Sequence, residues 1–385
     1  MKFVLVHPTY PPGWHDGGPV RAVFELATNL VALGHEVTVL TSVRDSRGHK
    51  YAAVGTVTEL GVTVVSSERM WPWRACLIPA QIVEALRWFR WADVIVQMSI
   101  FNFTSACTSI LARVLRKPTI VSPRGNLSPV ALAKTRLLKV LHGAVFEKPL
   151  LNSRAVLHCT SALDLGWAKA YAPGTEAVII PNGISAPGST PETRSSLAAD
   201  RTLTLMYMGR FHQIKNLEAL LAGFSSAGLP NARLVLVGRD EHAYSDRLAD
   251  IAAAIPSTTV LAFDTVDKWR LLQSADIVVL PSLSENFGNV VLEALAIGKP
   301  VLVSNTTGTS ALVAARRLGV VITPSVTGLS EGIRQIVADL PELSHNARLC
   351  ASEIRRTYAW STVAEQFAHL AALLLLDRSP LRKVT

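Results

Sequence analysis

Short apolar runs rich in Val, Ile and Leu recur along this 385-residue chain, and their rhythm restricts the fold more than any other feature. The first half contains KFVLVHP, EVTVLTS, VTVVSS, DVIVQMS, PTIVSPR and AVLHCTS, and the second contains LTLMYMG, ARLVLVG, TTVLAF, DIVVLPS, PVLVSN and GVVITP. Such nearly continuous runs are typical of parallel strands buried on both faces, and stretches of about 10 to 20 residues connect them. The alternation predicts βαβ units with helices on both faces of each sheet.

The series of runs restarts after the stretch SAPGSTP at residues 185–191. A chain of this length is also longer than one hydrophobic core usually serves. We therefore predict an α/β fold with two successive doubly wound, Rossmann-like domains, over residues 1–185 and 186–365. Residues 366–385 are expected to form a C-terminal helix and tail, which can return to the first domain.

The net charge of +9 is spread unevenly along the chain. Residues 1–185 contain 19 basic and 11 acidic residues, whereas residues 186–385 contain 19 basic and 18 acidic ones. The positive excess of the first half indicates an anionic partner, such as nucleic acid, a lipid headgroup surface or a phosphorylated substrate. No recognised nucleic-acid-binding module accompanies this charge, so nucleic acid is not an expected partner.

Several features favour a cytoplasmic protein. The chain opens directly on the apolar run FVLVHP, which predicts no secretory signal, and no apolar run approaches the roughly 20 residues of a membrane span. The four cysteines have no metal-ligand spacing and are interpreted as small core residues in a reducing compartment.

Two glutamates, Glu285 and Glu293, flank the sequence NFGNVVL after the run DIVVLPS. If a helix starts near Gly288, a rise of about 1.5 Å per residue separates their backbones by roughly 12 Å. A glycosidase holds its two carboxyl groups about 5 to 10 Å apart, so this pair is better suited to anchoring two ends of an extended ligand. A ligand with a polyol at each end would fit, and the amides of Phe287, Gly288 and Asn289 would face an anion.

Basic residues and glycines follow other runs, at the sheet edge where ligands bind in such folds. Arg210 and Lys215 come directly after LTLMYMG and can converge on a diphosphate; a solvated basic pair is the alternative. Gly17 and Gly18 precede a helix whose N-terminus favours a phosphate; a flexible turn is the alternative. The dinucleotide fingerprint G-x-G-x-x-G is missing here, which disfavours a nicotinamide dehydrogenase.

Together these segments resemble a known family. G-G-P near the start, I-P-N-G-I before the second domain, G-R-x4-K, and S-E-N-F-G-N-V-V-L-E-A-L-A-x-G-K-P-V are similar to segments of the retaining glycosyltransferases of family 4. The resemblance spans essentially the whole chain. It implies the GT-B fold, in which two Rossmann-like domains face each other across a cleft. It also implies transfer of a hexose from a UDP- or GDP-linked nucleotide sugar to a saccharide acceptor.

The resemblance further implies roles for individual residues. Glu285 would hold hydroxyls of the donor sugar, and Glu293 would hold the nucleotide ribose. Arg210 and Lys215 would neutralise the departing diphosphate, and with Glu285 they are the expected catalytic residues. The full set expected to bind the donor is Gly17, Gly18, Arg210, Lys215, Asn286, Phe287, Gly288, Asn289, Val290 and Glu293.

Two places depart from the family pattern. Residues 263–265, Phe-Asp-Thr, stand where many members have Phe-x-Gly, and Arg124 lies where many members place a histidine facing the acceptor. Arg124 either contacts the acceptor or diphosphate, or is a structural residue that pairs with a strand end. The other candidate contacts on the acceptor side are Asn126, His15 and Asp16.

The family chemistry resembles a front-face displacement in which the leaving diphosphate accepts the proton, so positioning and charge stabilisation replace a protein base. No Asp-x-Asp cluster suggests a metal, and no cofactor is expected beyond the donor substrate. His158 lies inside the run AVLHCTS and is expected to be a core histidine. Two alternatives remain open: a nucleotide-sugar epimerase or hydrolase of the same fold, and a non-catalytic nucleotide-sugar-binding protein.

Segments of the first half combine basic with large apolar residues. RMWPWRACLIP at 69–79 and LRWFRW at 86–91 interleave tryptophan with arginine, and ALAKTRLLKVLHGAVFEK at 131–148 has a basic, amphipathic helical pattern. We therefore predict a lipid-linked saccharide acceptor and peripheral binding to an anionic membrane on its cytoplasmic face, in polysaccharide or glycolipid biosynthesis. The alternative is that these tryptophans belong to a core and the basic residues to ordinary solvated faces.

Overall fold

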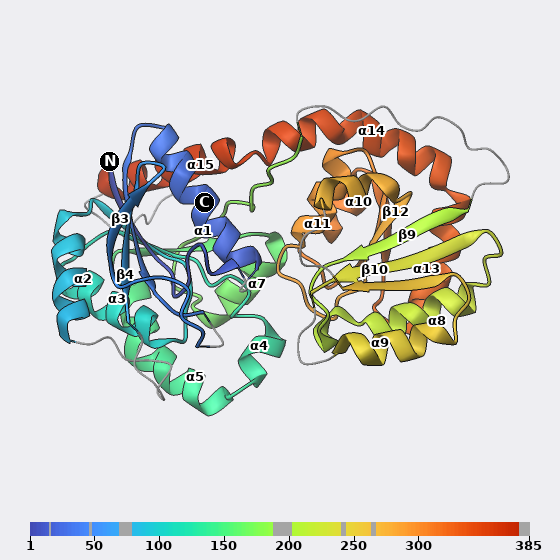
Figure 1. Cartoon of the computed structure of the whole chain (residues 1–385). Helices are drawn as coiled ribbons and strands as arrows, with labels where there is room; N and C mark the ends of the chain where they lie inside the picture. The colour runs from blue at the N-terminus through green and yellow to red at the C-terminus, as the bar shows by residue number, and fades with distance from the viewer. Residues whose placement is uncertain are drawn as a thin grey trace. The chain divides into compact units, whose positions relative to one another are not determined.

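The chain folds into two compact units, the first formed by Met1–Gly183 with Trp360–Thr385 and the second by Ile184–Ala359. Each unit has a sheet with helices on both faces (Figure 1), which is the α/β architecture predicted from the alternating runs. The computed structural model describes residues 1–14, 17–45, 48–68, 79–187, 202–239, 244–262 and 267–376.

The unit boundaries differ from the predicted ones. The first unit ends at Gly183 rather than at residue 185, and the chain returns to it at Trp360 rather than at residue 366. Trp360 begins α15 (Trp360–Leu376), and a Cβ added to Gly183 would lie 2.3 Å from the Trp360 side chain. The buried Trp360 thus holds the start of the returning helix.

The first sheet has eight strands in the order β3-β4-β2-β1-β5-β6-β7-β8, and only β3 is antiparallel to its neighbour. From β4 to β7 the order is that of a Rossmann fold. The sequence runs do not predict β3, whose side chains are all exposed, or β8, which has three residues. The strands are β1 (Lys2–Val6), β2 (Glu36–Ser42), β3 (Gly55–Glu59), β4 (Val62–Ser67), β5 (Val94–Gln97), β6 (Thr119–Val121), β7 (Ala155–Cys159) and β8 (Ala177–Ile179).

Helices cover both faces of this sheet, because side chains alternate along each strand. In β1, Phe3 and Leu5 share a core with α1 and α15, whereas Val4 and Val6 share a core with α2, α3, α6 and α7. Among the described residues, no helix has the length and apolar character needed to cross a membrane. The helices of this unit besides α15 are α1 (Gly18–Ala32), α2 (Pro79–Trp91), α3 (Phe103–Val114), α4 (Pro129–Ala133), α5 (Arg136–His142), the π-helix η2 (Gly143–Glu147), α6 (Lys148–Leu151) and α7 (Ala162–Tyr171).

The second sheet has six parallel strands in the order β11-β10-β9-β12-β13-β14, again the Rossmann order. All six correspond to runs predicted from the sequence. The strands are β9 (Leu203–Met208), β10 (Ala232–Gly238), β11 (Thr258–Ala262), β12 (Ile277–Leu280), β13 (Val301–Ser304) and β14 (Gly319–Ile322). The helices are η3 (Gln213–Lys215, a 3-10 helix), α8 (Leu217–Ala227), α9 (Tyr244–Ala253), α10 (Lys268–Ser274), α11 (Asn289–Ala296), α12 (Ser310–Ala315), α13 (Val326–Ala338) and α14 (Leu340–Thr357).

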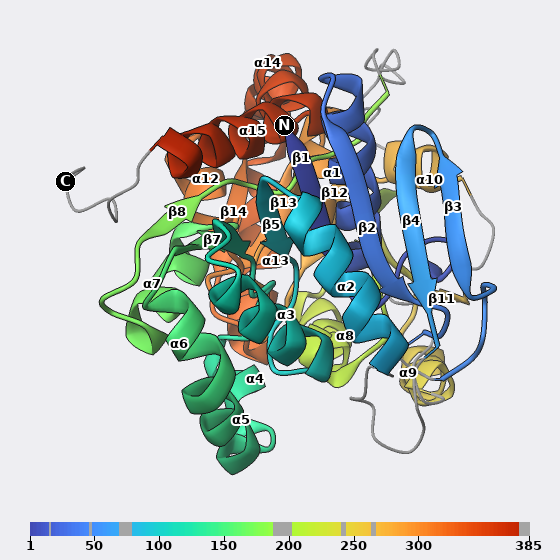
Figure 2. The same ribbon diagram turned by 90° about the vertical axis from the view of Figure 1, so that its left-hand side faces the viewer.

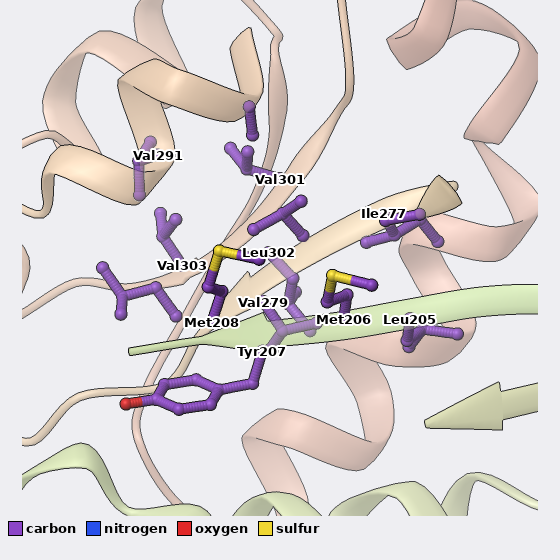
Figure 3. Close-up of a cluster of buried hydrophobic side chains, with 14 of the residues drawn as sticks. Leu205, Met206, Tyr207, Met208, Ile277, Val279, Val291, Val301, Leu302 and Val303 are labelled. Atoms are coloured by element: carbon purple, nitrogen blue, oxygen red, sulfur yellow. The ribbon is translucent and has the colours of Figure 1, made fainter. Parts of the chain in front are cut away.

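The core of the second unit is built around its central strands. Figure 3 shows side chains of β9, β12 and β13 packed together, among them the fully buried Leu205, Val279 and Leu302. Tyr207 is also fully buried, and its hydroxyl donates a hydrogen bond of 2.8 Å to the carbonyl oxygen of Arg210. The apolar core therefore supports the loop that leaves the end of β9.

Candidate active site

The second sheet brings two predicted segments together. β9 and β12 are neighbours at the point where the strand order reverses, and ligands in doubly wound folds bind beyond the strand ends at this point. The loop after β9 carries Arg210 and Lys215, and the loop after β12 carries Glu285. The two loops are in direct contact, since the N–H of Leu283 donates to the carbonyl oxygen of Ile214 at 2.9 Å.

An ion pair joins these loops. The ammonium group of Lys215 donates to a carboxylate oxygen of Glu285, and the two side chains are only 14% and 18% exposed. The backbone of Glu285 is held as well: its N–H donates to Thr306 O at 3.0 Å, and its carbonyl oxygen accepts from the N–H of Gly308 at 2.9 Å. Glu285 is thus a carboxylate in a defined position beside a positive charge, as a group that accepts hydrogen bonds from ligand hydroxyls requires.

A tight turn leads from Glu285 into α11, which begins at Asn289, next to the predicted start. Gly288 has a φ of 87°, a left-handed conformation that other residues rarely adopt. A Cβ at this position would lie 2.8 Å from the side chain of Leu280, so the turn has no room for one. Phe287 is 4% exposed and anchors the turn in the core. The turn therefore fixes the N-terminus of α11, where the helix dipole favours negative charge, at the edge of the sheet.

The remaining predicted residues of this stretch flank the same turn. Asn286 and Val290 are both partly buried, and Val290 packs against the core of the second unit. Asn289 is the first residue of α11 and is also partly buried. The stretch from Glu285 to Val290 therefore forms one compact turn and helix start at the end of β12. Six of the residues predicted to bind the donor or act on it lie in this stretch.

Glu293, on the second turn of α11, has its own lysine partner. Lys268 of α10 donates to a Glu293 carboxylate oxygen at 2.7 Å, and the two side chains are 25% and 13% exposed. The Lys268 ammonium also lies 4.8 Å from the ring centre of Trp269. Sequence reasoning does not identify Lys268, because nothing in the local pattern of α10 points to a partner 25 residues away. Each of the two glutamates is thus paired with a lysine from another element.

Arg210 is exposed, and its loop is fixed by its neighbours. Asn216 ends this loop in a left-handed conformation with a φ of 58°. Its side-chain amide donates to the carbonyl oxygens of Pro281, at 3.3 Å, and Pro324, at 3.0 Å. Asn216 therefore ties the loop that carries Arg210 to the end of β12, a positioning role that the sequence does not reveal.

In the first unit, Gly17 and Gly18 lie where the sequence predicts, at the N-terminus of α1. Gly17 has a φ of 72°, and Gly18 is exposed. Apart from its chain neighbours and its own helix backbone, no described atom lies within 4 Å of a Cβ added to Gly18, so its backbone is open to the close approach of a ligand. The candidates His15 and Asp16 lie outside the described residues.

Arg124, after β6, has the contacts of a structural residue. Its guanidinium donates to the side-chain oxygen of Asn182, in the segment that follows β8. Burial lowers the pKa of Arg124 to about 10, and the nearby Asp164 carboxylate acts in the opposite direction. These contacts support the interpretation that Arg124 ties strand ends together. Asn126 lies in the adjoining turn, where its N–H donates to the Pro123 carbonyl oxygen at 3.1 Å.

His158 is a buried histidine with both ring nitrogens hydrogen-bonded, as expected for a core residue. Its Nε2 lies 2.8 Å from the carbonyl oxygen of Ile180, which can only accept, so Nε2 carries the proton. Its Nδ1 therefore accepts from the hydroxyl of Ser122 at 2.7 Å. Burial, and after it the positive charge of Arg124, lower the pKa of His158 to about 3. His158 is neutral and structural at physiological pH.

Family comparisons agree with this geometry. A model described as a glycosyl transferase 4-like domain matches residues 17–183, and a model described as glycosyl transferases group 1 matches residues 189–350. The fold and these matches define a glycosyltransferase of the GT-B class. Within that class, the chain belongs to the group 1 glycosyltransferases of the family 4 type.

Individual proteins are similar to this chain in sequence or in fold. Glycogen synthase of Mycobacterium tuberculosis is 27% identical over 403 residues, which cover 96% of this chain and 94% of that protein. Lipopolysaccharide 1,2-N-acetylglucosaminetransferase of Salmonella typhimurium is 28% identical over 252 residues, or 60% of this chain and 65% of that protein. The crystal structure of Anabaena HepE in complex with UDP and glucose matches with a TM-score of 0.72 at 17% identity, covering 97% of this chain and 100% of that one.

Proposed function

We propose that this glycosyltransferase moves a hexose from a UDP- or GDP-linked nucleotide sugar to a lipid-linked saccharide, with retention of anomeric configuration. The product would serve polysaccharide or glycolipid biosynthesis. One observation carries the proposal: at the switch point of the second sheet, Glu285 and Glu293 are each paired with a lysine at either end of a fixed turn and helix N-terminus. This arrangement suits a ligand with hydroxyl groups at both ends and phosphates between them.

In the proposed complex, Glu285 accepts hydrogen bonds from hydroxyls of the donor sugar and Glu293 accepts them from the ribose. The N-terminus of α11, with Asn286, Phe287, Gly288, Asn289 and Val290, lies between the two glutamates along the chain. Arg210 and Lys215 supply positive charge for the diphosphate. Gly17 and Gly18 are further proposed donor contacts, and Gly18 is exposed.

The proposed reaction is a displacement on one face of the sugar ring. A hydroxyl oxygen of the acceptor bonds to the anomeric carbon while the bond from that carbon to the phosphate oxygen breaks. The hydroxyl proton passes to the departing phosphate oxygen, and Arg210 and Lys215 stabilise the negative charge that develops there. The chain contributes orientation and charge rather than a protein base.

Similar proteins support the choice of substrates. The HepE crystal structure is a complex with UDP and glucose, and the names of the two enzymes describe the synthesis of glycogen and the modification of lipopolysaccharide. The HepE complex thus holds a nucleotide and a sugar, and the two enzyme names each name a saccharide product or acceptor. The lipid linkage rests on the lipopolysaccharide enzyme and on the surface described in the next subsection.

Product analysis tests the proposal. The protein is incubated with a panel of UDP- and GDP-hexoses, with and without saccharide acceptors, and the anomeric proton of each product is followed by NMR. We expect an acceptor-dependent product with the donor's anomeric configuration. If the donor is mainly isomerised or hydrolysed even when acceptor is present, the epimerase or hydrolase is favoured. A product with inverted anomeric configuration would exclude retention. No turnover with any donor would favour a binding protein.

The Glu285→Gln variant sharpens this test. Glutamine keeps the size of the side chain but removes the charge paired with Lys215, so we expect a loss of at least about 100-fold in kcat with the fold intact. Glu218→Gln is the matched control. Glu218 lies on α8 and also forms an ion pair with a basic residue, Arg247. Equal rates for both variants would remove Glu285 from the reaction.

We also propose that transfer needs no bound metal. Arg210 and Lys215 can provide the charge that a divalent cation supplies in other enzymes. Full activity in EDTA is the expected result, and restoration only by added Mg²⁺ or Mn²⁺ would contradict it.

A further inference from the structure

The positive excess of the first half comes from one stretch of the chain. Residues 94–163 contain nine basic residues and one acidic residue, Glu147, whereas the rest of residues 1–185 contains ten of each. The structure describes this stretch completely. The basic residues are Arg113, Arg116, Lys117, Arg124, Lys134, Arg136, Lys139, Lys148 and Arg154.

The acidic exception does not reach the surface. Glu147 is 1% exposed, and its carboxylate accepts from the Ser105 hydroxyl at 3.0 Å and lies 2.8 Å from the Nδ1 atom of His142. Residues 94–163 therefore present positive side chains to solvent without an exposed carboxylate among them.

Large apolar side chains are exposed in the middle of this stretch. We call residues 130–145, from α4 through α5 into η2, the α5 tip. Leu137 and Leu138 are 72% and 67% exposed, and α5 buries none of its residues. The other exposed apolar side chains of the tip are Val130, Val140, Leu141 and Val145. Leucines this exposed, gathered in one place, mark a surface that meets an apolar partner.

The apolar side chains of α5 share one side of the helix. At about 100° per residue, Leu137, Leu138, Val140 and Leu141 span an arc of roughly 160°. Arg136 borders this arc, and Lys134 lies just before the helix; both are exposed. Lys139 lies on the opposite side and is only partly buried, with its ammonium group donating to the carbonyl oxygen of Ala131. The exposed side is thus aliphatic with a basic border.

The α5 tip is held firmly by the body of the first unit. α5 continues without a break through η2 and α6, and both of these pack against α3. The contacts of Glu147 with Ser105 and His142 lock this junction. In Figures 1 and 2, α5 lies at the end of the first unit opposite α15. The exposed leucines therefore belong to a structured projection.

The tryptophan-rich segment does not offer the same surface. Trp88 and Trp91 pack against the core of the first unit, and their rings contact each other at 5.3 Å. The Trp88 ring nitrogen also donates to Glu84 at 2.9 Å. Trp88 and Trp91 thus fit the alternative that these aromatics are core residues, and Trp71 and Trp73 lie outside the described residues.

We propose that the α5 tip inserts its leucines into the surface of an anionic lipid bilayer. A projecting helix with an aliphatic side and a basic border fits the boundary between acyl chains and negative headgroups. Aliphatic side chains without exposed aromatic rings on α5 do not suit the stacking of nucleic-acid bases. Two copies of this surface would place like charges together, which disfavours self-association. The inference rests on the proposed function only in that the bilayer would carry the acceptor lipid.

Co-sedimentation with vesicles tests the proposal. The full chain is mixed with phosphatidylcholine vesicles, alone or with about one-third phosphatidylglycerol, at low and high salt. We expect binding to the anionic vesicles that weakens as salt rises. Leu137→Gln with Leu141→Gln, and separately Lys134→Glu with Arg136→Glu, should each lower partitioning about tenfold or more.

Matched variants control for hydrophobicity and net charge. Leu349→Gln with Leu376→Gln replaces two other exposed leucines, and Lys169→Glu with Arg348→Glu changes the net charge as much as the tip variant does. Both control variants should bind vesicles like the unaltered chain. All tip variants should transfer sugar to a soluble acceptor at the unaltered rate, which separates lipid binding from the proposed function.

Three results would overturn the inference: no binding to anionic vesicles, equal binding by tip and control variants, or binding insensitive to charge reversal. A concentration-dependent dimer in sedimentation velocity that the leucine variants abolish would assign the tip to a second copy instead. These results do not depend on turnover, so they remain informative even if the proposed reaction fails.

Discussion

At the scale of single residues, the candidate site depends on pairs of charges that lie far apart in the sequence. Glu285 and Glu293 are visible in the sequence as a spaced pair, but their lysines are not visible as partners. The sequence marks Lys215 only as a basic residue that follows a strand, and it does not mark Lys268 at all. The chain pattern identifies which side chains follow strands, whereas the fold determines which of them meet.

Lys268 gives a prediction for donor binding. Lys268→Ala should raise the KM for the nucleotide sugar about tenfold with little change in kcat, because it frees the Glu293 carboxylate that we assign to the ribose. Lys268→Arg should retain most of the affinity by keeping the charge. Arg270→Ala, at an exposed site on the same helix, is the control. An unchanged KM for Lys268→Ala would mean that Glu293 needs no partner or does not contact the donor.

His158 gives a prediction for stability. Its pKa is about 3 in the folded protein against an ordinary value of 6.5. Between these two pH values His158 is therefore protonated in the unfolded chain but neutral in the folded protein. The free energy of unfolding should therefore fall as the pH drops below 6.5, by up to about 1.4 kcal/mol per pH unit from this residue. Above pH 6.5 His158 does not make the free energy of unfolding depend on pH.

Denaturant unfolding between pH 4 and 8 measures this slope. His158→Gln should flatten it, whereas His369→Gln, at an exposed position on α15, should leave it unchanged. The same slope in both variants would show that other groups cause the acid sensitivity.

At the scale of elements, the turn before α11 is the most constrained part of the site. Gly288→Ala should destabilise the second unit by about 1 to 3 kcal/mol, because the position combines a φ of 87° with no room for a Cβ. Gly166→Ala lies within α7, where no described atom outside the helix backbone and the chain neighbours is within 4 Å of the added Cβ, and it should be neutral or stabilising. Urea unfolding of both variants measures the difference, and equal stability would show that the turn adjusts without cost.

The sequence predicts the elements wherever burial leaves an apolar pattern. Each run named from the sequence became a strand, because central parallel strands are apolar on both faces. The strand β3 escapes prediction because its side chains are exposed and follow no apolar pattern. The residue at which the chain returns, Trp360 rather than residue 366, also escapes prediction, because it depends on the contact between Trp360 and the distant Gly183.

At the scale of the whole molecule, the two units carry different chemistry. The second unit is nearly neutral and holds the paired glutamates, and the first holds the charge excess and the exposed leucines of the α5 tip. This division fits an enzyme that takes a water-soluble donor on one unit and a lipid-borne acceptor on the other. Sequence composition alone shows the charge asymmetry, but only the fold shows which basic residues adjoin exposed leucines and which tryptophans pack against the core.

A nucleotide site at the switch point of the second sheet is the central claim, and calorimetric titration tests it most directly. UDP and GDP are titrated into the unaltered chain, into Glu293→Gln and into the control Glu353→Gln. The control removes a carboxylate that forms an ion pair with Arg316, away from Glu293 in the sequence. We predict that one of the two nucleotides binds, that Glu293→Gln weakens it by about tenfold or more, and that Glu353→Gln does not. Binding of equal strength to all three proteins, or no binding of either nucleotide, would contradict this assignment.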